Sequence, residues 1–173
     1  MIDILKFIFL ILTVFVCAYT DLKYRVVKNK VVAISIIVGI LLNFIENGFK
    51  GFLSSAIGVI IPFVVLFVLF AIRAFGAGDI KLVCAIGAIM GIDFVINNFI
   101  FSVFIGFLMI ILSSMIDKNT VKKLKDFVLS IFNMFLSRTI SDSISPKDKK
   151  GIPFAVAIFI ATIVQVISKV EIF

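Results

Sequence analysis

Six long apolar stretches occupy most of this 173-residue chain, and they restrict its fold more than any other feature. They cover approximately residues 4–20, 31–46, 52–72, 79–92, 94–116 and 152–169. An apolar helix needs about 20 residues to cross a bilayer, and most of these runs approach that length. Only 16% of the residues are charged, against about a quarter in typical soluble domains. The sequence therefore predicts an all-α, polytopic membrane protein with six transmembrane helices, forming a single membrane-embedded domain over residues 1–173.

The first apolar run has the length of a secretory signal, but its charges argue for a retained span. Asp3 precedes Lys6 at its start and a basic cluster follows its end, which is the wrong polarity for a cleaved signal. The fourth run is the shortest, and its 12 residues Ile80–Gly91 rise only about 18 Å as a helix. We expect flanking residues to join it or the bilayer to thin around it.

The basic residues gather in alternate connections, which predicts the topology. The first, third and fifth connections hold 14 of the 17 Lys and Arg residues. Basic residues near span ends favour the cytoplasmic side, so these connections are expected in the cytoplasm and both termini outside the cell membrane. Because the charges serve topology and lipid contact, the net charge of +7 does not predict a nucleic-acid partner.

Apolar residues recur at three- and four-residue spacing between approximately residues 121 and 140, with charged and polar residues between them. This pattern predicts an amphipathic helix on the cytoplasmic membrane surface before the last span. A weak seventh span is the alternative, although four charges fall within its first six residues.

The composition excludes several kinds of active site. The chain has no histidine, so a Ser-His-Asp triad and a His-ligated zinc site are impossible. Its two cysteines, Cys17 and Cys84, stand alone in apolar runs, so we expect no metal site, no cofactor and no disulfide.

Two acidic residues lie where hydrolytic chemistry is possible. Asp21 directly follows the first span and Asp79 directly precedes the fourth, so the alternating topology brings both to the cytoplasmic side. Two neighbouring carboxylates share a proton, and such a pair can activate water and polarise a carbonyl group. The alternative is that both merely pair with nearby basic residues at the membrane interface.

Asp79 lies in the segment Gly76-Ala77-Gly78-Asp79-Ile80-Lys81-Leu82, in which glycines precede an acid at the start of a helix. Glycines permit close backbone approach and unusual dihedral angles, so Gly76 and Gly78 would let an extended substrate lie beside the acid. This segment closely resembles the signature of the prepilin peptidase family, which are intramembrane aspartic proteases of the GxGD type.

Two further segments extend the resemblance over almost the whole chain. Residues 21–29 are similar to the family's first catalytic segment, and Gly151-Ile152-Pro153-Phe154 is similar to the segment that opens its last span. The resemblance departs at Lys28 and Val156, where many relatives have proline. The chain also lacks the cysteine-rich insert of larger family members, so the resemblance implies peptidase activity without N-methyltransferase activity.

The resemblance implies an aspartic endopeptidase that removes the basic leader of type IV prepilin-like proteins at the cytoplasmic membrane face. Asp21 and Asp79 would be catalytic, and Gly76, Gly78, Pro153 and Phe154 would shape the site. Lys81 is expected to steady Asp79 or the substrate, unless it is only a membrane anchor. Two alternatives stay open, namely a small ion-coupled transporter and a noncatalytic assembly partner with a peptidase-like fold.

Overall fold

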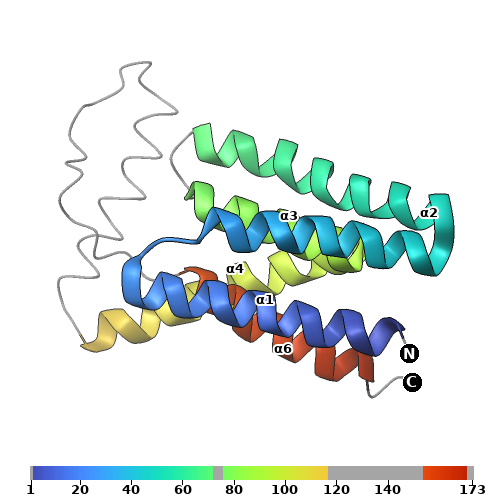
Figure 1. Cartoon of the computed structure of the whole chain (residues 1–173). Helices are drawn as coiled ribbons and strands as arrows, with labels where there is room; N and C mark the ends of the chain where they lie inside the picture. The colour runs from blue at the N-terminus through green and yellow to red at the C-terminus, as the bar shows by residue number, and fades with distance from the viewer. Residues whose placement is uncertain (1, 72–75, 117–153, 171–173) are drawn as a thin grey trace. The chain divides into compact units, whose positions relative to one another are not determined.

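The computed structural model describes residues 2–71, 76–116 and 154–170, and every regular element in this part of the chain is helical (Figure 1). The helices are α1 (Ile2–Tyr24), α2 (Asn29–Ala71), α3 (Ala77–Met90), α4 (Ile92–Ile116) and α6 (Phe154–Val170). The predicted all-α class is confirmed for these residues. Contacts divide the chain into one unit of Met1–Ile105 with Pro153–Phe173 and a second unit of Gly106–Ile152.

Among the described residues, three helical stretches are long and apolar enough to cross a membrane, namely α1, α2 and residues 92–112. Helix α6 is apolar but shorter. Many large apolar side chains on these helices are exposed, as the lipid-facing side of a membrane protein requires. The crossing of all six predicted spans and their orientation stay predictions, and the expected amphipathic helix at 121–140 lies outside the described residues.

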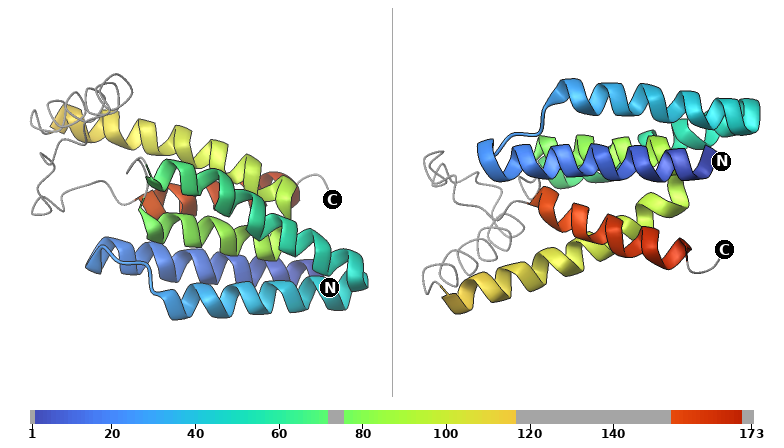
Figure 2. Two further views of the ribbon diagram at one scale, coloured as in Figure 1. Left: turned by 90° about the horizontal axis from the view of Figure 1, so that it is seen from above. Right: turned by 60° about the horizontal axis from the view of Figure 1, so that its bottom comes forward.

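Helix α2 consists of two helical arms that run in opposite directions and are joined at Gly48 (Figures 1 and 2). Gly48 has φ 58° and ψ −138°, a conformation that glycine adopts far more easily than other residues. The two arms correspond to the predicted helices at 31–46 and 52–72. The turn at Gly48 therefore separates two helices, which share the label α2.

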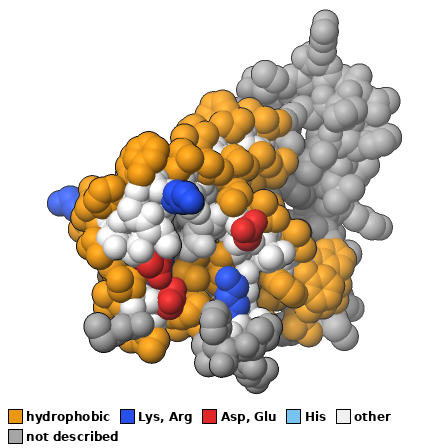
Figure 3. All heavy atoms as spheres, turned by 90° about the vertical axis from the view of Figure 1, so that its right-hand side faces the viewer, with side chains coloured by type: hydrophobic (Ala, Val, Ile, Leu, Met, Phe, Trp, Pro, Cys, Tyr) orange, Lys and Arg blue, Asp and Glu red, His pale blue; other side chains and the backbone are white. Residues whose placement is uncertain are grey.

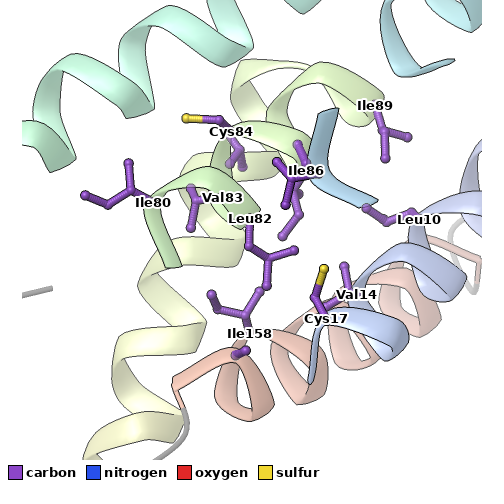
Figure 4. Close-up of a cluster of buried hydrophobic side chains, with 14 of the residues drawn as sticks. Leu10, Val14, Cys17, Ile80, Leu82, Val83, Cys84, Ile86, Ile89 and Ile158 are labelled. Atoms are coloured by element: carbon purple, nitrogen blue, oxygen red, sulfur yellow. The ribbon is translucent and has the colours of Figure 1, made fainter. Parts of the chain in front are cut away.

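Helix α3 is the most buried element of the first unit. Residues 82–86 and 88–89 of α3 are at most 3% exposed. Figure 4 shows its side chains beside those of α1 and α6, and the residues of this core include Leu10, Val14 and Cys17 from α1, Leu82, Ile86 and Ile89 from α3, and Ile158 from α6. This burial explains why so short a helix carries almost continuous apolar sequence.

Small residues bring α2 and α3 into backbone contact. A Cβ added to Gly87 would overlap the carbonyl oxygen of Gly58, and one added to Gly91 would lie 3.0 Å from Ser54 Oγ. Small residues four apart, here Ser54 with Gly58 and Gly87 with Gly91, are a sequence pattern that permits close helix packing. The structure shows this packing, because the pair on α2 faces the pair at the end of α3.

Buried polar side chains connect the helices inside the first unit. Lys6 is only 6% exposed, forms an ion pair with Glu46 and donates a 2.7 Å hydrogen bond to Asn43 Oδ1. Asn43 Nδ2 in turn donates to the carbonyl oxygens of Ala88 and Ile89, at 3.0 and 2.9 Å. These bonds satisfy carbonyl groups in the last turn of α3, which otherwise lack helical partners. Figure 3 looks onto this end, where acidic and basic side chains lie among apolar ones.

Polar contacts of the same kind join the other helices. Thr13 and Ser35 hydroxyls are 3.0 Å apart between α1 and α2. Between α4 and α6, Asn98 donates to Thr162 at 3.0 Å and Gln165 donates to the Phe94 carbonyl at 3.1 Å. Such bonds fix helix register where apolar packing alone gives little preference.

The first prediction concerns the contact between α2 and α3. The substitution Gly87→Ala is expected to destabilise the protein by about 1–3 kcal/mol or more, because the added methyl group forces two backbones apart. The matched control is Ala33→Val, which adds carbon atoms to an exposed position of α2. Thermal unfolding in detergent should show a lower Tm for Gly87→Ala only. Equal Tm values for the two variants would contradict the packing described here.

Candidate active site

Asp21 lies in the last turn of α1, at the point where that helix ends. The Arg25 amide donates to the Asp21 carbonyl at 2.9 Å, and Arg25 itself has φ 55°. This left-handed residue terminates α1 and turns the chain toward α2. The Asp21 side chain is half-buried, and the Arg25 guanidinium acts on its carboxylate electrostatically. Of the basic neighbours that the sequence offered as partners for Asp21, Arg25 acts on it electrostatically.

Asp79 is the third residue of α3, and its carboxylate caps the N-terminus of that helix. Gly76 is the N-cap, and its carbonyl accepts hydrogen bonds from the amides of Asp79 and Ile80, at 3.1 and 3.3 Å. The Gly76 amide donates to the Asp79 carboxylate. This is the return half of a capping box, in which the third helical residue binds the N-cap amide. The helix dipole also favours a carboxylate at this position.

The two acids lie 58 residues apart in sequence but interact in the folded chain. Helix α1 ends and α3 begins at the same end of the helices (Figures 1 and 2). The carboxylate of Asp21 is close enough to Asp79 to act on it electrostatically. Asp79 is half-buried, as Asp21 is, so both carboxyl groups lie partly enclosed at this end of the helices.

A third element reaches the pair through its backbone. The amide of Ala155, in the first turn of α6, donates a hydrogen bond to the Asp21 carboxylate. Phe154 begins this helix and is half-buried, whereas Pro153 lies outside the described residues. Sequence reasoning placed Phe154 near the site but missed Ala155, because a main-chain donor has no side-chain signature. The only available signal was its position directly after the Pro-Phe segment.

The connection between α1 and α2 packs against the beginning of α3. A Cβ added to Gly78 would lie 3.1 Å from both Cβ and Cγ2 of Val27, which is itself buried. Three residues after Gly78, Lys81 Nζ donates a 3.0 Å hydrogen bond to Asn29 Oδ1 at the start of α2. Residues of the two predicted catalytic segments thus touch at two points beside the acids.

Gly76 and Gly78 of the predicted motif matter for the space left by their missing side chains rather than for unusual backbone angles. Gly76 has φ −77°, and the described glycines with positive φ are Gly48 and Gly91. Gly76 and Gly78 therefore do not use the positive-φ conformations that glycine permits. A Cβ on Gly76 would lie 3.1 Å from Asp79 Oδ2, and one on Gly78 would press on Val27. The missing side chain at Gly76 leaves space beside the Asp79 carboxylate, whereas Val27 occupies the space beside Gly78.

The two positions that depart from the resemblance lie at helix starts. Lys28 is exposed, and its carbonyl accepts the amides of Val31 and Val32 at 3.1 and 3.3 Å, which begins α2. Val156 is half-buried in the first turn of α6. Neither residue supplies an acid, and each lies at the beginning of its helix.

A carboxylate pair held by main-chain donors is suited to acid–base catalysis. One group can accept a proton from water while the other, protonated, donates to a carbonyl oxygen. Among the described residues no group of three or more His, Cys, Asp or Glu side chains gathers in a way that would hold a metal ion.

Comparison with known proteins gives one match. A model of the type IV leader peptidase family matches residues 8–111, a range that contains Asp21 and Asp79 but ends before α6. A search of curated proteins and a search of solved structures returned no significant match.

The contact of Val27 with Gly78 predicts a cross-link between the two acidic segments. The double variant Val27→Cys with Gly78→Cys should form an intramolecular disulfide on mild oxidation, because the two Cβ atoms need only a small adjustment to reach disulfide geometry. The matched control replaces Val27 by its exposed neighbour, as Val26→Cys with Gly78→Cys. Mass spectrometry of the digested protein measures both. A cross-link that forms no faster in the first variant than in the control would contradict this geometry.

Proposed function

The chain belongs to the type IV leader peptidase family, and from this premise we propose that it is a membrane aspartic endopeptidase with Asp21 and Asp79 as its catalytic pair. The observation that supports this most strongly is the interaction of the two carboxylates at one end of the helices. Each acid ends or begins a helix, so each is fixed by backbone bonds rather than by a mobile loop. The Gly76 and Ala155 amides orient the carboxylates of Asp79 and Asp21 respectively.

The proposed reaction needs only water as a co-reactant. One ionised carboxylate takes a proton from water while the water oxygen attacks the scissile carbonyl carbon, and the other carboxyl group donates its proton toward the carbonyl oxygen. A tetrahedral intermediate forms. Its collapse breaks the C–N bond as the amine nitrogen takes a proton from the first carboxyl group. The second carboxylate takes back a proton from the hydroxyl group of the intermediate that becomes the new C=O, so the pair regains its single shared proton.

The proposed substrate is a type IV prepilin-like protein with a short basic leader before an apolar helix. Basic connections on the same side as the two acids support a site at the cytoplasmic face of the cell membrane, with both termini outside. Half-burial of the two acids suits a scissile bond at the level of the membrane surface. A noncatalytic partner with this fold would bind such a client without needing both acids, which a cleavage assay distinguishes.

The test is cleavage of a tagged prepilin-like client by the wild type and by Asp21→Asn and Asp79→Asn. Each substitution should lower cleavage by at least about 10³-fold, because asparagine cannot exchange the proton that the reaction requires. Asp93→Asn is the matched control, since Asp93 also lies in the first turn of a helix but at the opposite end. Membrane abundance is measured for all variants. Normal cleavage by both single variants of the pair would contradict the mechanism.

The Ala155 amide gives a second prediction about activity. Ala155→Pro removes the donor to Asp21, whereas Val156→Pro removes an amide one residue later in the same first turn. Proline is tolerated in the first turn, where amides have no helical acceptor. Cleavage should fall about 10-fold or more in Ala155→Pro and much less in Val156→Pro, at matched abundance and Tm. An equal loss in both would show that the Asp21 contact is not responsible.

A further inference from the structure

The hydrogen bond from Lys81 to Asn29 connects α3, which carries Asp79, with α2, which follows Asp21. Asn29 is the first residue of α2, eight positions after Asp21, and Lys81 lies two positions after Asp79. Side chains two apart on a helix do not face each other, so Lys81 extends away from the Asp79 side chain. Its recorded partner is Asn29 Oδ1, at 3.0 Å.

The Lys81–Asn29 hydrogen bond lies beside a second contact, between Val27 and Gly78, and adds a directional interaction to it. Val27 packs on Gly78 in the same connection, and its apolar contact resists separation of the two segments but permits sliding. A hydrogen bond between a cation and an amide oxygen fixes the register along the helix because it depends on distance and angle. Together they attach the short turn after α1 to the start of α3.

We propose that Asn29 and Lys81 act as a pair of positioning residues that sets the placement of Asp21 relative to Asp79. This inference rests on the proposed function for its effect on cleavage. The turn from Arg25 to Lys28 is only four residues long, so fixing its far end at Asn29 restricts where the last turn of α1 can lie. Small errors in the placement of reacting groups cost about 10²-fold in rate.

The experiment compares Asn29→Leu, Lys81→Met and the double variant in cleavage of a synthetic leader peptide with its apolar helix. Each single variant should lower kcat about 10-fold with little change in KM, and the double variant should be no worse than either. Asn29→Asp retains an acceptor for Lys81 and should keep most of the activity. Lys30→Ala, at an exposed lysine next to Asn29, is the matched control and should cleave normally.

A second readout measures placement without any substrate. The rate of disulfide formation between Val27→Cys and Gly78→Cys should fall about 3-fold or more when Asn29→Leu or Lys81→Met is added, and Asn29→Asp should restore it. If the wild type cleaves no client, the proposed function fails and this rate alone decides the positioning role. An unchanged rate overturns the inference. The inference is also overturned if the loss of kcat in the double variant equals the product of the losses in the single variants. It is overturned as well if Lys81→Met changes only KM, which would indicate direct substrate binding.

Discussion

The burial of α3 is the constraint on which the other contacts of the first unit depend. The helix is buried at Ile80 and from Leu82 to Ile89, and α2 approaches it so closely that Gly58 and Gly87 bring their backbones into contact. Close packing of this kind replaces the hydrophobic driving force, which is weak between helices in lipid. Because α3 is only 14 residues long, the same packing fixes both of its ends.

The two ends of α3 are held by different means, and the difference suits their roles. At its last turn, Asn43 satisfies carbonyl groups and is itself bound by the buried Lys6. At its first turn, Gly76 and Asp79 bind each other, and the carboxylate is left partly accessible. The last turn of α3 is therefore rigidly held, whereas its first turn leaves the Asp79 carboxylate accessible to water and to a polypeptide. The α6 amide at Ala155 does for Asp21 what Gly76 does for Asp79.

The sequence predicted features that depend on periodicity and chain direction. Apolar runs located the helices, and alternation of spans placed Asp21 and Asp79 at one end. Small residues four apart indicated close helix packing, but neither the pairing of Gly58 with Gly87 nor the Ala155 amide contact could be predicted, because neither has a distinguishing side chain. The burial of Lys6 was also missed, since a lysine near a span end usually reaches the membrane surface and only the fold shows its partners Asn43 and Glu46.

An experimental structure in a lipid nanodisc would test the central claim most directly. The bound ligand would be a leader peptide whose scissile bond is replaced by a hydroxyl-bearing mimic of the tetrahedral intermediate. The account predicts that the hydroxyl lies within hydrogen-bond distance of both the Asp21 and Asp79 carboxylates, with Ala155 and Gly76 amides still bound to them. A peptide bound with its hydroxyl away from either carboxylate would contradict the assignment of these two acids as one catalytic pair.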